Sequence, residues 1–263
     1  HTCDSKLCNI CNYNRKRGLR RKYLTWFNEN EQLIQYDDKY LTKTQAQIKN
    51  ITGKEIDYDV MHLTLTVPHT EDGFNGNRYY FRDIISKFNA LRRNDEFKDY
   101  VLAGEYGVET TRNKNGLHIH IHSLLLVKRS KQNRNHLHRI ILYKWNKQTI
   151  NTDIKRNYLD NETKANILKS NKLINDDFIK QLNPMGATII GLETIYSYYN
   201  GIKNRNIGFG TKNFINAILE TIKYHFEPAF LNKKDGHFDI DLICEVLPEI
   251  YRQPLYRKFG AWH

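Results

Sequence analysis

Three histidines alternate with isoleucines in the stretch NGLHIHIHSLLLV, residues 115–127. Residues two apart in a β-strand share a face, so His118, His120 and His122 all project to one side of a strand here. Buried imidazoles need partners, and neutral imidazole is a good ligand for divalent transition metals. The run therefore predicts a metal site, with a row of exposed strand histidines as the alternative.

A carboxylate ligand is expected from the preceding segment, YVLAGEYGVETT, residues 100–111. The Asn-Gly pair in NKNG, residues 113–116, predicts a hairpin turn between this segment and the histidine run. Either a loop of residues 113–116 or a two-residue turn at Asn-Gly places Glu109 opposite one of the last two histidines, on their face of the hairpin. Glu105 then lies further along, near the leucines, and we keep it as the alternative ligand.

The elements that must hold this hairpin follow from the periodicity of the flanking sequence. VMHLTLTVPH, residues 60–69, alternates with β-branched residues and predicts a strand. Apolar residues recur at helical spacing over residues 78–93 and again over 213–226. Residues 23–50 and 130–190 also have a largely helical pattern.

Composition limits the class of protein and its partners. The 263 residues carry a formal net charge of +12, and 40% of them are hydrophobic, as in a globular chain. The positive charge favours a polyanionic partner, with nucleic acid as the first candidate and a merely basic protein as the alternative. No apolar run approaches the roughly 20 residues of a membrane helix, so we expect no membrane partner.

Three of the four cysteines cluster near the beginning of the sequence. Cys3, Cys8 and Cys11 have the spacing C-x4-C-x2-C, which is more typical of a metal site than of disulfides in an intracellular protein. A tetrahedral zinc site needs a fourth ligand, which His1 or an upstream residue can supply. We therefore predict a structural zinc site, and three unliganded thiols are the alternative.

The histidine strand resembles the histidine–hydrophobic–histidine motif of the HUH endonucleases. More narrowly, the chain is similar to the rolling-circle plasmid replication initiators (Rep proteins), which are related to the HUH transposases. The pattern His-x-His-x-Leu-Leu places the ligand pair on His120 and His122. His118 matches the first position of the longer His-Pro-His-x-His form as a third ligand, although Ile119 replaces the proline. The acidic ligand of the family falls on Glu109.

Three further segments carry the resemblance. HLTLTVPH, residues 62–69, resembles the first family motif, a Leu-Thr-Leu-Thr strand. CDSKLCNICNYNRKR, residues 3–17, resembles the cysteine-rich segment upstream of it, and RKFG, residues 257–260, resembles a C-terminal arginine–glycine stretch. With the histidines and the tyrosine described next, the resemblance covers most of the chain.

The resemblance also implies a tyrosine nucleophile. In ETIKYHFEP, residues 220–228, Glu220 and Tyr224 are four apart and share a helix face. The family pattern Glu-x-x-Lys-Tyr implies Tyr224 as the nucleophile that forms a 5′-phosphotyrosyl link, Glu220 as the activator of water, and Lys223 as a phosphate or DNA contact. The further family lysine after the tyrosine is absent, which puts that local phosphate contact in doubt. An ordinary amphipathic helix is the alternative for this segment.

A second tyrosine group competes for the same role. YSYYNGIK, residues 196–203, contains Tyr199-x3-Lys203, a spacing found in other HUH branches. The Asn-Gly pair within it would break a helix. Tyr199 and Tyr196 are kept as alternative nucleophiles, and Tyr196, Tyr198 or Tyr199 could instead be a second nucleophile, as in two-tyrosine transposases.

The resemblance implies an α+β chain with the HUH endonuclease fold. A central antiparallel β-sheet of the ferredoxin or RRM kind is expected to carry the histidines on its middle strands, with helices on the opposite face. We expect a cysteine-rich basic segment over residues 1–50 and the catalytic domain over residues 51–263.

The implied function is a single-strand DNA endonuclease that initiates rolling-circle replication with Mn²⁺ or Mg²⁺. Expected partners are single-stranded or extruded origin DNA and host replication proteins. The expected location is the cytoplasm of a bacterium, with the protein encoded by a plasmid or mobile element. The alternatives are an HUH transposase or mobilisation relaxase, a metal-dependent hydrolase without a covalent step, and a zinc-containing nucleic-acid-binding module without catalysis.

Overall fold

The computed structural model describes most of the central part of the chain and short segments at both ends: residues 13–14, 17–22, 25, 33–36, 39–67, 81–113, 116–129, 133–155, 190–199, 202–203, 240–241, 243–244, 248 and 256–262. Its elements follow in the order β1 (Leu33–Tyr36), β2 (Lys39–Thr42), α2 (Lys43–Thr52), β3 (Tyr58–Thr66), α3 (Phe81–Arg93), α4 (Asp95–Tyr100), β4 (Val101–Asn113), β5 (Gly116–Lys128), α5 (Asn133–Lys155), β6 (Ile190–Tyr199), β7 (Ile202–Lys203) and β8 (Tyr256–Gly260).

Six strands form one antiparallel sheet in the order β7-β6-β3-β5-β4-β8, while β1 and β2 form a separate hairpin. The histidine strand, β5, pairs with β3 on one side and with β4 on the other. It is therefore one of the two middle strands. The prediction of an α+β chain with a central antiparallel sheet is confirmed at this level.

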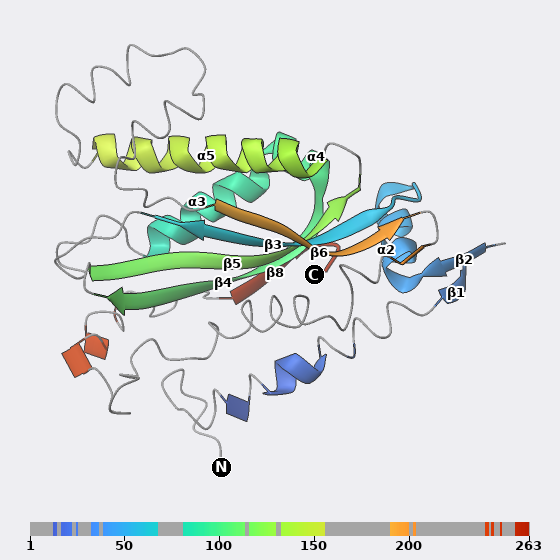
Figure 1. The fold of residues 1–263 in the computed structure, drawn as a ribbon, viewed down its shortest axis with the longest axis horizontal. Coiled ribbons are helices and arrows are strands. Elements are labelled where there is room, and N and C mark those ends of the chain that lie inside the picture. The colour runs from blue at the N-terminus through green and yellow to red at the C-terminus, as the bar shows by residue number, and fades with distance from the viewer. Residues whose placement is uncertain are drawn as a thin grey trace, which may run out of the picture.

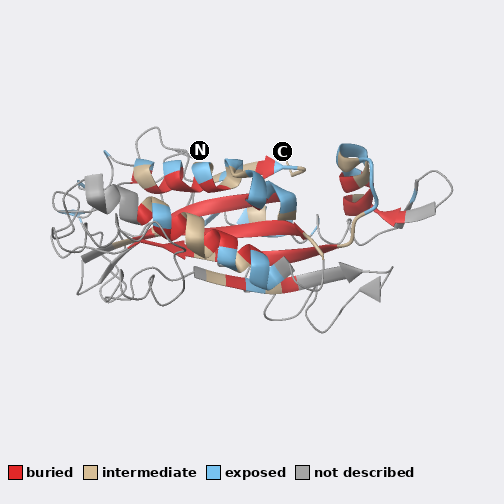
Figure 2. Ribbon diagram, turned by 90° about the horizontal axis from the view of Figure 1, so that it is seen from above, coloured by how far each residue is buried: buried red, intermediate tan, exposed pale blue. Residues whose placement is uncertain are grey.

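Helices α3, α4 and α5 lie together on one side of the sheet (Figure 1). The alternation of the strands turns one apolar row of each toward them. Figure 2 shows buried residues along the strands and on the helix sides that face the sheet. The main buried cluster includes residues from β3, β5, α3 and α5: Met61, Leu63, Leu65, Ile119, Ile121, Ile84, Phe88, Leu91, Leu137, Ile141 and Trp145.

Side chains of α5 also bond to strand carbonyls. The indole Nε1 of the fully buried Trp145 donates to the carbonyl of Thr66 at 2.7 Å. The guanidinium of Arg134 donates to the carbonyl of Leu192 on β6 at 3.2 Å. Because these acceptors belong to β3 and β6, α5 is held to the sheet by hydrogen bonds as well as by apolar packing.

The other face of the sheet has a smaller apolar cluster to which α2 contributes. Ile48 of α2 packs there with strand residues that include Val60 and Leu126. Thr42 begins α2 with a reciprocal capping box, and Gly53 ends it in the left-handed conformation. The helix crosses the boundary predicted between residues 50 and 51, and the division into two units stays a prediction.

The segment before α2 differs from the prediction. Residues 33–36 and 39–42 form two paired β-strands, where a continuous helical stretch over 23–50 was expected. Ile34, Tyr36, Tyr40 and Thr42 belong to residue types that favour strands. Each run is only four residues long. Together with its polar neighbours, such a short run does not show a clear strand period, so the segment was predicted as helical.

Strand β8 is the edge strand beside β4, and two glycines allow the two strands to pack closely. A Cβ atom on Gly104 of β4 would lie 2.5 Å from the ring of Phe259. Gly260 has φ +65°, and a Cβ there would lie 2.2 Å from the carbonyl oxygen of Leu102. The RKFG segment thus has a structural role, since its last two residues pack directly on β4.

Candidate metal centre

The hairpin of β4 and β5 brings one carboxylate and two imidazoles together. Glu109 of β4 pairs in register with His120 of β5, and Asn113 pairs with Gly116. This is the register that a 113–116 loop requires. His122 lies two residues further along β5 on the same face.

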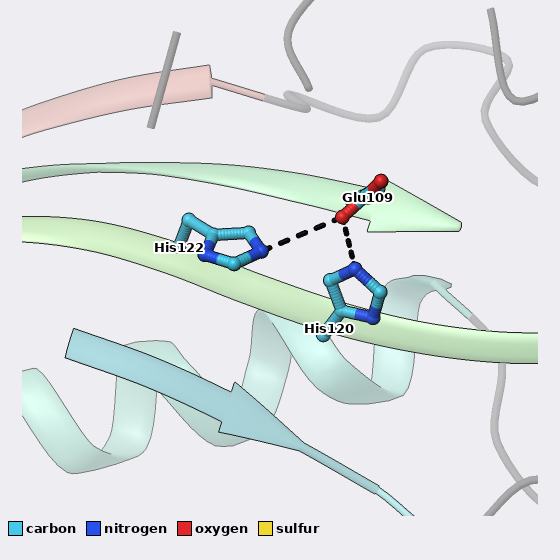
Figure 3. A group of neighbouring side chains, drawn as sticks. All are labelled: Glu109, His120 and His122. Atoms are coloured by element: carbon cyan, nitrogen blue, oxygen red, sulfur yellow. Dashed lines mark hydrogen bonds and ion pairs between the residues drawn. The ribbon is translucent and has the colours of Figure 1, made fainter. Parts of the chain in front are cut away.

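The ligand atoms of these three residues converge on one point. One nitrogen or oxygen atom from each of Glu109, His120 and His122 lies within 4.8 Å of the others. Figure 3 shows Glu109 Oε2 directed between the two rings. It contacts His120 Nε2 directly and lies 3.4 Å from His122 Nε2. The three side chains are each about a tenth exposed, at 10 or 11%, so the cluster is mostly removed from water.

The environment of Glu109 favours its anionic form. Burial alone would raise its pKa, but the hydrogen bonds and charges of His120 and His122 outweigh burial and lower the pKa below its ordinary value. An ionised carboxylate is the form that coordinates a cation. The group therefore presents one anionic oxygen and two imidazole nitrogens.

This donor set fits a divalent cation. Two imidazoles and a carboxylate suit Mn, Fe, Co or Zn, and the carboxylate is also a ligand type for Mg. Three side-chain ligands leave coordination positions for water or substrate. The arrangement can hold a Lewis acid, and its chemistry does not select one metal.

Two side chains of β3 surround His122. Thr64 pairs with His122 in register, and its Oγ1 lies 3.4 Å from Nδ1 of that ring. The ring of His62 stacks on His122 with centroids 5.5 Å apart and planes inclined by 14°. Burial, and then the neighbouring His122, lower the pKa of His62 to about 4, so its imidazole is neutral at neutral pH.

His118 lies beside this group without belonging to it. Its ring meets the ring of His120 edge-on at a centroid distance of 5.0 Å. Among the described residues, the group whose ligand atoms converge consists of Glu109, His120 and His122. The metal-ligand role predicted for His118 as an optional third histidine stays a prediction.

Glu105, the alternative acidic ligand, is engaged elsewhere. It pairs with Leu124 and is fully buried. Its Oε2 accepts a hydrogen bond from the Tyr256 hydroxyl at 2.9 Å, and its Oε1 has no hydrogen-bond partner within the part of the chain that the structure describes. Burial raises the pKa of Glu105 to about 7, although Tyr256 and Lys258 oppose the rise.

The other predicted site residues are not placed by the structure. Tyr224, Glu220 and Lys223 lie outside the described residues, as do Cys3, Cys8, Cys11 and His1 of the predicted zinc site. The predicted roles of Tyr224 and of the zinc site therefore stay predictions.

The competing tyrosines lie on strand β6. The backbone of Tyr196 pairs with Val60, four residues along β3 from the partner of His122, and Tyr199 pairs with Ile202 of β7. Tyr199 and Lys203 therefore lie on two paired antiparallel strands and not on one helix face. The helical reading of the Tyr199-x3-Lys203 spacing does not apply.

Sequence reasoning missed His62 and the contact of Thr64. The HLTLTVPH segment had been singled out as a motif, but no residue in it received a role. Its alternation places His62 and Thr64 on one face and the apolar Leu63 and Leu65 on the other. That pattern was visible, whereas the register between β3 and β5 was not.

Comparison with known proteins adds no relative. No family model, curated protein or solved structure matches this chain. Among the described helices, none combines the length and apolar composition needed to cross a membrane.

Proposed function

We propose that the chain is a metal-dependent DNA endonuclease of the HUH superfamily, similar to rolling-circle replication initiators. One observation supports this most directly. Glu109, His120 and His122 converge on the face of the β4–β5 hairpin that points away from α3 and α5. Two histidines on a middle strand, with a carboxylate beside them, are what the HUH resemblance implies. These three side chains would hold Mn²⁺ or Mg²⁺.

A bound divalent cation supplies Lewis-acid polarisation of the scissile phosphate. In the proposed step, the Tyr224 phenol oxygen forms a bond to phosphorus, and the bond from phosphorus to the 3′-oxygen breaks. The phenol proton is lost and the leaving oxygen gains a proton, so a free 3′-hydroxyl and a 5′-phosphotyrosyl link result. Glu220 activates water for the terminating hydrolysis, and Lys223 contacts phosphate.

The substrate of this proposal is single-stranded or extruded DNA at an origin. The net charge of +12 favours a phosphate backbone as partner, and a strand gripped for in-line attack must be free of its complement. Host replication proteins would then extend the free 3′-hydroxyl in the bacterial cytoplasm.

The test is a covalent adduct assay. The protein is incubated with labelled single-stranded DNA carrying candidate origin sequences, with Mn²⁺, Mg²⁺ or EDTA, and separated on a denaturing gel. We expect a metal-dependent labelled adduct that is lost in Tyr224→Phe and reduced at least about 100-fold in His120→Ala. Thr110→Val, which changes the helix-covered face of β4, is the matched control and should retain the adduct.

Other results would identify the alternatives. An adduct that survives in Tyr224→Phe but disappears in Tyr196→Phe or Tyr199→Phe would move the nucleophile to β6. Cleavage without an adduct would indicate a hydrolase that has no covalent step. Adducts formed at transposon ends or transfer origins would favour a transposase or relaxase. DNA binding without cleavage on any of these substrates would favour a zinc-containing binding module.

A further inference from the structure

We propose that Thr64 and His62 of β3 are positioning residues that orient the His122 imidazole so that its Nε2, and not its Nδ1, faces Glu109. The role rests on the proposed metal centre, because the orientation would serve metal binding. The orientation of the ring itself does not depend on a metal. It assigns a role to the HLTLT segment of β3.

Thr64 acts on the nitrogen of His122 that points away from the ligand cluster. Its Oγ1 lies 3.4 Å from Nδ1, while Nε2 lies 3.4 Å from Glu109 Oε2 on the other side of the ring. A hydroxyl both donates and accepts hydrogen bonds. It can therefore donate to Nδ1 when Nε2 carries the proton, and accept from Nδ1–H when Nε2 binds a cation. A partner on the outer nitrogen is what fixes the tautomer of a ligating histidine.

His62 acts on the plane of the same ring. It lies two residues from Thr64 along β3, opposite Leu124, and its ring is nearly parallel to that of His122, with centroids 5.5 Å apart. Rotation of the His122 ring about its Cβ–Cγ bond would break the near-parallel stack with His62 and move Nδ1 away from Thr64. The stack and the Thr64 contact therefore both oppose this rotation.

The alternation of β3 lets one short segment contribute both to the core under the helices and to the surroundings of the metal cluster. Leu63 and Leu65 are fully buried in the core under the helices, whereas His62 and Thr64 face the metal cluster. Because β3 pairs with β5 over nine consecutive positions, the packing of the two leucines fixes where the other two side chains stand relative to His122.

The first test measures metal affinity directly. Mn²⁺ is titrated into the full chain by calorimetry, with Co²⁺ absorption as a second readout. Thr64→Val keeps the shape but removes the hydroxyl, and we expect it to weaken binding about 10- to 100-fold, the usual loss when an outer-shell partner is removed. Thr64→Ser restores the hydroxyl and should recover most of the affinity. Binding by Thr64→Val that equals wild-type binding would overturn the role of Thr64.

The control for this series is Thr110→Val. Thr110 is buried on β4 and pairs with Ile119, so its side chain lies on the helix-covered face. Its hydroxyl has no hydrogen-bond partner among the described residues. The same substitution there should leave metal affinity unchanged. For His62, phenylalanine preserves the stack and should retain affinity, whereas alanine should lose about 10-fold. Equal affinities in His62→Phe and His62→Ala would overturn the stacking role.

The second test needs no metal. In the metal-free protein, long-range ¹H–¹⁵N spectra of the imidazoles report which nitrogen of His122 is protonated. Thr64→Val should shift the Nδ1 signal of His122, and Thr110→Val should not. If wild-type protein binds neither Mn²⁺ nor Co²⁺, the proposed metal centre fails, yet this shift still decides the positioning inference. An unchanged Nδ1 signal in Thr64→Val would overturn it.

Discussion

The buried carboxyl of Glu105 should make the stability of this chain depend on pH in a direction opposite to that of most acidic side chains. Glu105 is fully buried and accepts a hydrogen bond from Tyr256. Burial raises its pKa from 4.5 to about 7. The folded protein therefore binds this proton more tightly than the unfolded chain does.

The sign and size of the effect follow from that difference. The contribution of Glu105 is fully present below pH 4.5 and is lost as pH rises through about 7. One pKa unit is worth about 1.4 kcal/mol, so the complete loss is about 3 kcal/mol, of which about 2.5 kcal/mol falls between pH 5 and pH 8. Because Glu105 is fully buried, solvent screening reduces this figure little.

The assay compares the free energy of unfolding in urea for wild type and Glu105→Gln at pH 5, 6, 7 and 8, in EDTA. Glutamine keeps the volume and still accepts a hydrogen bond from Tyr256, but it cannot ionise. We expect the variant to gain about 2.5 kcal/mol relative to wild type between pH 5 and pH 8.

An exposed glutamate in the same row of the sheet is the control. Glu193 of β6 pairs with His62, which pairs with Leu124, the partner of Glu105. Glu193→Gln should leave the wild-type pH profile in place. Parallel profiles for wild type and Glu105→Gln would refute the reasoning, because they would mean that Glu105 ionises in the folded protein as easily as in the unfolded chain.

Three other substitutions test how the sheet and its helices are held. Gly260→Ala should cost about 2–4 kcal/mol in urea unfolding, because residue 260 has φ +65° and a Cβ there meets the Leu102 carbonyl at 2.2 Å. Trp145→Phe should cost about 1–3 kcal/mol by thermal unfolding, because it leaves the Thr66 carbonyl without its indole donor. Thr42→Ala should cost about 1 kcal/mol by removing the capping box of α2, and Thr42→Ser should restore most of it. A loss below 0.5 kcal/mol in any of the three would contradict the contact named for it.

The ligand cluster could be anticipated from sequence because it depends on short-range geometry. Alternation places His120 and His122 on one face, and a tight turn fixes the parity of the strand before it. Glu109 is therefore constrained by a loop of a few residues. The structure pairs Glu109 with His120, one of the two registers that this reasoning left open.

Contacts between residues far apart in the sequence could not be predicted from local patterns. Thr64 and His122 are 58 residues apart, and Tyr256 and Glu105 are 151 apart. Strand pairing at such separations depends on the packing of the whole sheet and helix layer, which no local pattern specifies. The β1–β2 hairpin was missed for a different reason, since its strands are shorter than the window needed to tell a period of two from a period of 3.6.

Two glutamates on one face of β4 have opposite pKa shifts because their surroundings differ. Glu105 and Glu109 are four residues apart on the same strand, and sequence alone could only rank them as ligands. Glu109 stands opposite His120, and its two imidazole neighbours lower its pKa. Glu105 stands opposite Leu124, and burial raises its pKa to about 7. The first carboxyl is thus suited to hold a cation and the second to hold a proton, because their cross-strand neighbours differ.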